Sequence, residues 1–474
     1  MHIIKFLNDI IWSNVFLILC IGAGLYFSFV TKFLQVRYIK DMVTLLFKES
    51  SDSKGVSPFQ AFSIAIAGRV GTGNIAGVAT AIAMGGPGAV FWMWMIAFFG
   101  AATAFIEATL GQIYKIEKEG QYKGGPAYYI ERGLGVKWYA LLFAIATMIS
   151  CTLFLPGVQS NSIADSMNNA FNIPPYVTGI SVAALLAVII FGGVQRIARV
   201  SEVIVSFMAG AYILMAVVIL FLNLNEIPEI FSLIVKSAFG IDATFGGIIG
   251  MAVSWGIKRG IYSNEAGQGT APHAAAAAAT SHPVKQGLVQ AFSVYIDTLF
   301  VCSSTAFIIL FTGKYNVKNP AGGFLLEQLP GIEEGPAFTQ AAVASHFPSI
   351  GNEFIAFALL FFAFTTAIAY YFIAESNLHY LHGNNPTSKL KINILRIVFL
   401  VSVYFGCISK GGDAWMIGDI GVGIMAWLNI VAIILLQKPA LKAFKDYESQ
   451  KRAGKNPTFD PEKLNIRNTI WKKD

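Results

Sequence analysis

The chain has 474 residues, of which 55% are apolar and 13% are charged, and its net charge is +7 at pH 7. Soluble domains carry about 25% charged residues, so this composition excludes a disordered chain and argues against a water-soluble enzyme. The 38 Phe and 45 Gly suit helices packed in lipid. The composition therefore predicts an all-α polytopic membrane protein, in which the positive charge reflects cytoplasmic Lys and Arg and not nucleic-acid binding.

Eleven stretches are long and apolar enough to be transmembrane helices, since a span needs about 20 mostly apolar residues. The first stretch is too long for a signal peptide, whose apolar core has about 7–15 residues. The expected spans are residues 10–31, 58–83, 88–112, 138–162, 176–192, 200–222, 240–278, 287–312, 353–378, 392–409 and 413–437.

Lys and Arg predict the orientation, because cytoplasmic loops carry an excess of both. If the loop after the first span is inside, 28 of the 34 Lys and Arg lie on the inner side and 5 on the outer side. This predicts a multi-pass protein of the plasma (inner) membrane with its N-terminus outside. Residues 438–474 are expected to form a basic cytoplasmic tail that contacts either solvent or anionic membrane lipid.

The second span is interrupted by Gly68-Arg69-Val70-Gly71-Thr72-Gly73-Asn74-Ile75-Ala76-Gly77. Each of its four glycines costs about 1 kcal/mol relative to Ala in a helix, and freed backbone groups are expensive in lipid. We therefore expect a broken helix whose free N–H groups attract a carboxylate and whose free carbonyls coordinate a cation. Close packing of small residues against a neighbouring helix is the alternative.

A dinucleotide-binding loop is a further alternative for the same segment, because Gly71–Ala76 fits the pattern G-x-G-x-x-A. That motif requires a preceding strand and an acidic residue about 20 positions later. No Asp or Glu occurs between Asp52 and Glu107, so this reading is rejected.

The seventh span, residues 240–278, is also too interrupted to be one regular helix, since it contains Gly256, Gly260, Gly267, Gly269 and Pro272. One interrupted span opens a group of five spans (58–222) and the other opens a second group (223–437). The two groups begin on opposite sides of the membrane, because five is an odd number. An N-terminal segment (1–57) with one extra helix, followed by two inverted five-helix repeats, is typical of secondary transporters, whose site lies at the repeat interface.

Four sequence blocks resemble the alanine/glycine:cation symporter family. They are Gly85-Gly86-Pro87-Gly88-Ala89-Val90-Phe91-Trp92-Met93-Trp94, Gly73-Asn74-Ile75-Ala76-Gly77-Val78-Ala79-Thr80, Gly124-Gly125-Pro126 with Tyr128-Tyr129-Ile130-Glu131, and Lys258-Arg259-Gly260 with Ser263-Asn264-Glu265-Ala266-Gly267. The resemblance covers about residues 10–440. It implies an APC-superfamily-type fold with broken first and sixth core helices, and cation-driven uptake of small neutral amino acids.

The resemblance also implies where the ligands bind. The amides of Thr72 and Gly73 are expected to take the substrate carboxylate, and Asn74 belongs to the same segment. The carbonyls near Gly68 and Val70 are expected to face sodium. The sodium ion is co-transported, and no further cofactor is expected.

Residues from two other spans are expected to complete the site. Thr365 and Thr366, on the eighth core helix, would add hydroxyl ligands for sodium, since hard cations prefer oxygen; bonding to their own helix is the alternative. Gln159 would hold the amino or carboxylate group of the substrate, or else join two helices. Tyr370 stands where many family members carry Trp, which affects pocket size and leaves alanine, glycine, D-alanine and glutamine open.

Three charged residues within spans remain without an assigned role. Intramembrane charges are functional by default: Arg69 is expected at an inner gate or paired with Glu107, Glu265 or Asp297, and either Glu107 or Asp297 is a candidate for a coupling proton. Sodium is preferred over a proton as the driving ion. A membrane-embedded enzyme is not expected, since no metal or nucleophile motif occurs, and a non-transporting amino acid receptor is the remaining rival.

Overall fold

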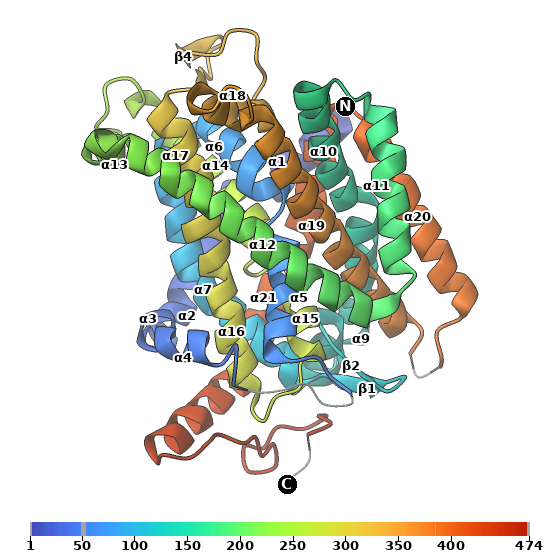
Figure 1. Ribbon diagram of the computed structural model, residues 1–474. Coiled ribbons are helices and arrows are strands. Elements are labelled where there is room, and N and C mark those ends of the chain that lie inside the picture. The colour runs from blue at the N-terminus through green and yellow to red at the C-terminus, as the bar shows by residue number, and fades with distance from the viewer. Residues whose placement is uncertain (1, 49–53, 384, 472–474) are drawn as a thin grey trace.

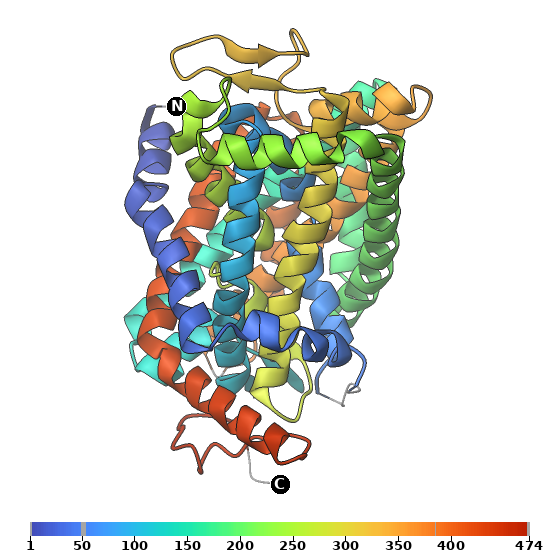
Figure 2. The same ribbon diagram turned by 90° about the vertical axis from the view of Figure 1, so that its left-hand side faces the viewer.

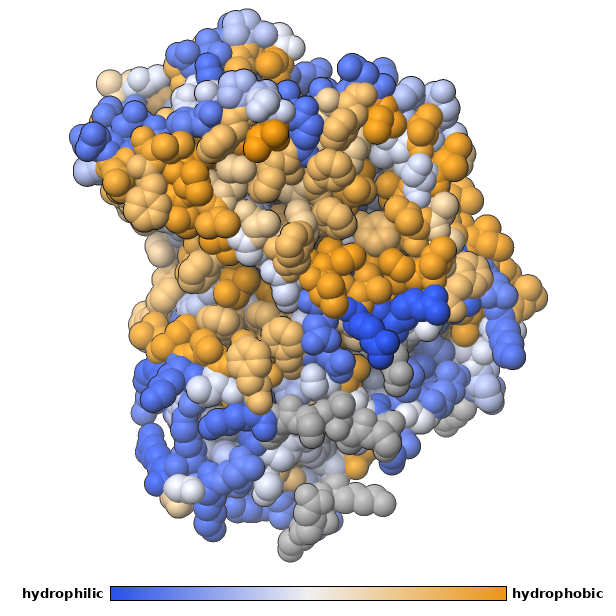
Figure 3. Space-filling view, viewed as in Figure 1, coloured by the Kyte–Doolittle hydropathy of each residue, from blue (hydrophilic) through white to orange (hydrophobic). Residues whose placement is uncertain are grey.

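The computed structural model describes residues 2–48, 54–383 and 385–471, which form a bundle of long helices (Figure 1). In this described part, eight helical segments are long and apolar enough to cross a membrane. On the face shown in Figure 3, a broad apolar band crosses the middle of the bundle, and polar residues gather toward its two ends. The structure confirms a mostly helical membrane protein, with eight candidate spans and four short strands in its described part.

The N-terminal segment forms one long helical pair and two short helices. These are α1 (His2–Ile11), α2 (Asn14–Val30), α3 (Leu34–Arg37) and α4 (Ile39–Thr44). The pair α1–α2 provides the first candidate span, whereas α3 and α4 lie at the opposite end of the bundle from the N-terminus (Figure 1).

The first group of spans follows. It comprises α5 (Pro58–Arg69), η1 (Gly73–Gly77), α6 (Val78–Gly85), α7 (Gly88–Ile113), β1 (Ile116–Lys118), β2 (Gln121–Lys123), α8 (Pro126–Tyr129), η2 (Ile130–Leu134), α9 (Lys137–Ile149), η3 (Ser150–Phe154), α10 (Leu155–Phe171), α11 (Pro175–Ile190) and α12 (Gly193–Leu222). Strands β1 and β2 pair antiparallel, with Ile116 opposite Lys123.

The second group begins with η4 (Leu224–Glu226) and with α13 (Ile227–Ala238), which runs across the bundle end (Figure 2). It continues with η5 (Gly246–Ile248), α14 (Ile249–Asn264), α15 (Ala271–Ala277), α16 (Pro283–Tyr295), η6 (Ile296–Cys302), α17 (Ser303–Thr312), β3 (Asn316–Lys318), β4 (Phe324–Glu327), α18 (Pro336–His346), α19 (Gly351–Leu381), α20 (Lys389–Ile408) and α21 (Gly411–Arg452). Helix α13 and the antiparallel pair β3–β4 lie at the end that carries the N-terminus (Figure 1, Figure 2).

Both interrupted spans are broken helices. Helix α5 begins at a capping box, in which Ser57 and Gln60 satisfy each other's backbone amides, and it ends at Arg69, after which Val70 is extended. The chain then resumes as the π-helical turn η1. The seventh predicted span divides into α14 and α15, with residues 265–270 between them.

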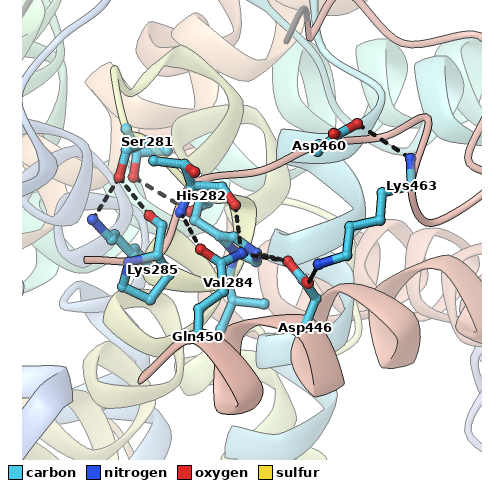
Figure 4. A network of polar contacts seen from close by, with 11 residues as sticks. Ser281, His282, Val284, Lys285, Asp446, Gln450, Asp460 and Lys463 are labelled. Atoms are coloured by element: carbon cyan, nitrogen blue, oxygen red, sulfur yellow. Dashed lines mark hydrogen bonds and ion pairs between the residues drawn. The ribbon is translucent and has the colours of Figure 1, made fainter. Parts of the chain in front are cut away.

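The C-terminal segment packs against the protein. Beyond α21, the N–H of Phe459 donates to the Ser281 carbonyl (3.0 Å), and the indole of Trp471 donates to the Gln112 carbonyl (2.9 Å). Asp446 on α21 accepts from Lys463 and lies 3.6 Å from His282 (Figure 4). The described part of the expected basic tail thus covers the end of the bundle opposite the N-terminus, while residues 472–474 lie outside the described residues.

Candidate functional site

The first break exposes backbone carbonyls to a hydroxyl of α19. Val70 leaves the helix with φ −77° and ψ 90°. The Thr366 hydroxyl oxygen lies 2.8 Å from the carbonyl oxygen of Ala67, 3.3 Å from that of Val70 and 3.0 Å from that of Phe362 in its own helix. The hydroxyl has a single proton to donate to these three carbonyl oxygens. The remaining oxygen lone pairs are ligands of the type that a hard cation prefers.

The substrate-side residues converge on the same break. The amide N–H of Thr72 donates to Gln159 Oε1 on α10 (3.0 Å). The N–H of Gly71 donates to Asn74 Oδ1 (2.8 Å). A Cβ at Gly73 would lie 3.2 Å from Ser263 Cα at the end of α14. The expected substrate residues Thr72, Gly73, Asn74 and Gln159 are therefore neighbours.

Gly71 joins the two halves of this site. A Cβ there would collide with the hydroxyl oxygen of Thr366 and would lie 2.9 Å from Gln159 Oε1. Only glycine leaves room for both side chains to approach the backbone at one residue. The expected sodium side and substrate side are thus one contiguous site.

Three other expected site residues are placed differently from Thr366. The Thr365 hydroxyl lies near only the carbonyls of Phe361 (3.1 Å) and Phe362 (2.9 Å), in its own helix. Gly68 faces the second break, since a Cβ there would lie 3.2 Å from Glu265 Oε2. Tyr370 is buried and also neighbours Glu265.

The second break is held by a carboxylate. Positive φ values at Glu265 (56°), Gly267 (85°) and Gly269 (82°) turn the chain between α14 and α15. Glu107 on α7 accepts the N–H of Gly267 (3.2 Å) and that of Gly269 (3.1 Å). Asn429 on α21 donates to the same carboxylate (2.7 Å). Asn429 was missed from the sequence, although an amide in an apolar span is a signal for it.

Arg69 links the two breaks. Its Nε donates to the Asn264 carbonyl at the end of α14 (2.6 Å). Its Nη1 donates to the Gln290 carbonyl (3.2 Å) and to the Ser293 hydroxyl on α16. Among the described residues, Arg69 has no carboxylate oxygen within 4 Å, so it forms hydrogen bonds with two carbonyls and a hydroxyl and no ion pair with the expected acids.

A cavity of about 950 Å³ opens at the bundle end that carries the N-terminus, and it is lined by Lys5, Asn8, Thr80, Arg259, Trp415 and Asp419, among others. Arg259 donates to both carboxylate oxygens of Asp419 (2.8 and 3.1 Å). The rings of Tyr262 and Trp415 are 5.0 Å apart. A Cβ at Gly77 would lie 3.7 Å from Trp415, so this aromatic and ionic layer contacts η1, the turn that follows the first break.

This cavity corrects one step of the orientation argument. Lys258 and Arg259 were counted on the inner side, but they share the cavity with Lys5 near the N-terminus, and Lys258 donates to Asn8 (3.1 Å). Both residues lie within α14 and not in a loop. Moving these two from the inner 28 leaves 26 against 7, so the asymmetry persists.

In the described part of the chain, no group of three or more His, Cys, Asp or Glu side chains is placed to bind a metal ion. The chemistry that the site offers is instead hydroxyl, carbonyl and amide groups in a buried break. These groups bind ions and polar ligands, and they provide no nucleophile–base pair for covalent catalysis.

Comparison with known proteins identifies the family of the chain. The sequence model described as "Sodium:alanine symporter family" matches residues 1–461. YrbD of Bacillus subtilis (strain 168) is 59% identical over 469 residues, which are 99% of this chain and 97% of YrbD. A "Sodium/proton-dependent alanine carrier protein" of Bacillus sp. (strain PS3) is 50% identical, with 91% of this chain and 97% of the carrier covered.

Two further similarities bear on substrate and fold. GlnT of Bacillus subtilis (strain 168), which is named for sodium and glutamine, is 46% identical, with 99% of this chain and 95% of GlnT covered. A crystal structure of a manganese transporter from Eremococcus coleocola has a TM-score of 0.53 at 12% identity, covering 88% of this chain and 94% of that chain. This last likeness concerns the fold alone.

Proposed function

Since the chain belongs to the sodium:alanine symporter family, and is a transporter and not an enzyme, we propose that it imports a small neutral amino acid, alanine or glycine, together with sodium. The first break carries this proposal. There the Thr366 hydroxyl meets the carbonyls of Ala67 and Val70, and the Gln159 side chain meets the Thr72 amide, around a single glycine.

Each group at the break has a role in transport. Sodium takes the carbonyl oxygens of Ala67 and Val70 with the Thr366 hydroxyl. The substrate carboxylate replaces Gln159 Oε1 as the acceptor for the Thr72 N–H and adjacent amides. Gln159 then turns to the substrate. Because the two ligands share one break, each raises the affinity for the other by the same factor.

We also propose the finer architecture. The eleven spans comprise one N-terminal helix and two five-helix repeats, 58–222 and 223–437. The two repeats are inverted relative to each other in the membrane, because each contains an odd number of spans. This is supported by a broken helix at the start of each group and by the N-terminus and the C-terminal segment lying at opposite ends (Figure 2). The remaining charge asymmetry places the N-terminus outside and residues 438–474 in the cytoplasm, in a plasma-membrane protein.

Two alternatives share the site but differ in ligand. The relative GlnT is named for sodium and glutamine, which favours a larger substrate. Tyr370, which neighbours Glu265, is the residue that we propose to set the size of the substrate site. The name of the Bacillus sp. (strain PS3) carrier includes a proton as well as sodium, which makes the driving ion the second open choice.

Uptake into proteoliposomes tests the proposal. Labelled alanine is supplied outside, under an inward sodium gradient, an inward proton gradient or neither, with unlabelled glycine, D-alanine and glutamine as competitors. We expect accumulation above the external concentration under sodium alone. Binding of alanine without accumulation under any gradient would instead identify a receptor.

A further inference from the structure

Backbone hydrogen bonds join the two broken helices at the end of the bundle opposite the N-terminus, which we call the inner end. Just before α5, the N–H of Val56 donates to the Ala277 carbonyl at the end of α15 (3.0 Å), and the N–H of Ala279 donates to the Val56 carbonyl (2.9 Å). We call these three residues the latch. A ligand that leaves the first break toward the inner end requires this end to open, so the latch is a contact that transport has to release.

Two side chains from the end of α7 hold the residue inside the latch, Ala278. Gln112 Nε2 donates to the Ala278 carbonyl (2.9 Å), and the Lys115 ammonium donates to the same oxygen (3.1 Å). Gln112 also donates to the Ala275 carbonyl. Both side chains are buried. The latch is therefore fixed to α7 as well as to the segment before α5.

Trp471 contacts both of these residues. Its indole N–H donates to the Gln112 carbonyl (2.9 Å), and the Lys115 ammonium lies 4.7 Å from the centre of its ring, which is a cation–π distance. Trp471 is the last described residue of the segment 453–471, which follows α21 along the inner end (Figure 1) and which we call the strap. The strap thus reaches the two residues that support the latch.

The strap is also bound to the loop that follows the latch. The N–H of Phe459 donates to the Ser281 carbonyl (3.0 Å), and the Ser281 hydroxyl donates to the Pro457 carbonyl (2.9 Å). Phe459 is only 4% exposed, and its ring lies 5.3 Å from the ring of Trp471. The two anchors of the strap, one at the loop and one at α7, therefore pack against each other.

A third anchor joins the strap to η2. The Arg132 guanidinium donates to the Asn468 carbonyl (3.2 Å), and the Asn468 side chain donates to the Arg132 carbonyl (3.0 Å). The strap therefore bridges three segments, which are η2, the end of α7 and the loop between α15 and α16. A movement that separates any two of these segments breaks contacts of the strap.

We propose that the strap is an autoinhibitory element, which fastens the latch and slows the opening of the inner end. The inference rests on the proposed inward transport and adds a control to it. The strap acts as a ligand that binds the closed arrangement better than the open one, and such a ligand shifts the population toward the closed arrangement. Release of the strap therefore leaves the latch easier to part.

Hydrogen–deuterium exchange tests the fastening without a transport step. Trp471→Ala removes the indole donor and the ring over Lys115. In the purified full-length variant, without sodium or alanine, we expect the Val56 amide to exchange about tenfold faster than in the wild type. In the described part of the chain Val56 bonds to the latch and not to the strap, so loss of cover alone does not change its exchange. Trp138→Ala, which removes a 69% exposed tryptophan from the first turn of α9, is the matched control and is expected to keep the wild-type rate.

Uptake into proteoliposomes tests whether the fastening inhibits transport. At saturating sodium and alanine, we expect Trp471→Ala to raise the initial rate of alanine uptake about twofold or more. An unchanged or lower rate, with a wild type that accumulates alanine, would overturn the inference and leave the proposed function standing. A wild type that accumulates no alanine would overturn the proposed function, whereas the exchange measurement still decides whether the strap fastens the latch.

Phe459→Ala covers the case in which Trp471→Ala does not fold, as judged by its size-exclusion profile. It removes the ring between the Ser281 loop and Trp471 and keeps the contacts of Trp471 with α7. We expect a smaller effect, with exchange of the Val56 amide about threefold faster than in the wild type. Unchanged exchange of Val56 in whichever of the two variants folds would refute the strap.

Discussion

Replacing Gly71 with Ala tests whether the two halves of the site depend on one residue. The new methyl carbon would lie 2.9 Å from Gln159 Oε1 and 3.1 Å from Thr366 Cβ, and closer still to the Thr366 hydroxyl. Nonbonded atoms prefer about 3.5–4.0 Å, so both side chains must move. Overpacking of this kind costs about 1–3 kcal/mol.

The movement removes the contacts that the site uses. Displacing Thr366 and Gln159 breaks their bonds to the Val70 carbonyl and the Thr72 amide, which contribute about 0.5–1.5 kcal/mol each. Since about 1.4 kcal/mol is a factor of ten in affinity, we expect the KM for alanine and the half-saturating sodium concentration both to rise roughly 10- to 100-fold. Initial rates of alanine uptake in proteoliposomes measure both quantities.

Gly77→Ala is the matched control in the same broken span. A methyl there would lie 3.7 Å from Trp415 and 3.8 Å from Arg259, which are ordinary contact distances, and its backbone is helical. We expect transport at the wild-type level. If Gly71→Ala transports like Gly77→Ala, with both folded, the reasoning that joins the sodium and substrate sides at Gly71 is wrong.

Three further predictions concern side chains around the breaks. Thr366→Ala is expected to raise the half-saturating sodium concentration for uptake about tenfold. Thr365→Ala is expected to change that concentration by no more than about twofold, because the Thr365 hydroxyl contacts only its own helix. Equal effects of the two variants in the uptake assay would contradict this. Glu107→Gln turns one accepting oxygen into an N–H donor that faces a backbone amide, so one buried amide loses its acceptor at a cost of about 1–3 kcal/mol. Tm in detergent should therefore fall by several degrees, and an unchanged Tm would refute that role. Asp419→Asn leaves both Arg259 and Lys258 without their shared carboxylate at a cost of about 3–5 kcal/mol. The triple variant with Arg259→Gln and Lys258→Gln should regain most of the lost Tm, and failure to do so would exclude direct pairing.

Glycines marked both breaks in the sequence, but only one break was located from them. Four glycines within residues 68–77 left a single place for the first interruption. In the seventh span, glycines occur along its length and serve two purposes. A Cβ at Gly256 would lie 2.5 Å from the Ala89 carbonyl oxygen, so this glycine packs α14 against α7. Gly267 and Gly269 instead take positive φ and break the helix. Composition alone does not distinguish these uses.

Contacts between spans that are distant in the chain were also difficult to predict from the sequence. The meeting of Thr366 with the first break was expected only through the family resemblance, which the comparisons confirm. For Arg69, charge suggested Glu107, Glu265 or Asp297 as a partner, whereas the structure gives it carbonyls. The end of a helix has unpaired carbonyl oxygens, which attract a guanidinium group as a carboxylate does. Because every residue has a backbone carbonyl, the sequence does not show which carbonyls are left unpaired.

The two breaks are held in different ways, and this difference bears on how transport proceeds. At the first break, neutral groups meet the backbone: the Thr366 hydroxyl and the Gln159 amide, at about 0.5–1.5 kcal/mol per bond. A ligand that makes equivalent bonds can exchange with them at little net cost. At the second break, the buried Glu107 carboxyl group holds two backbone amides and Asn429 at once, so a ligand would have to replace three bonds together. We therefore expect sodium and substrate to bind and leave at the first break. The second break is expected to keep its conformation while they do so.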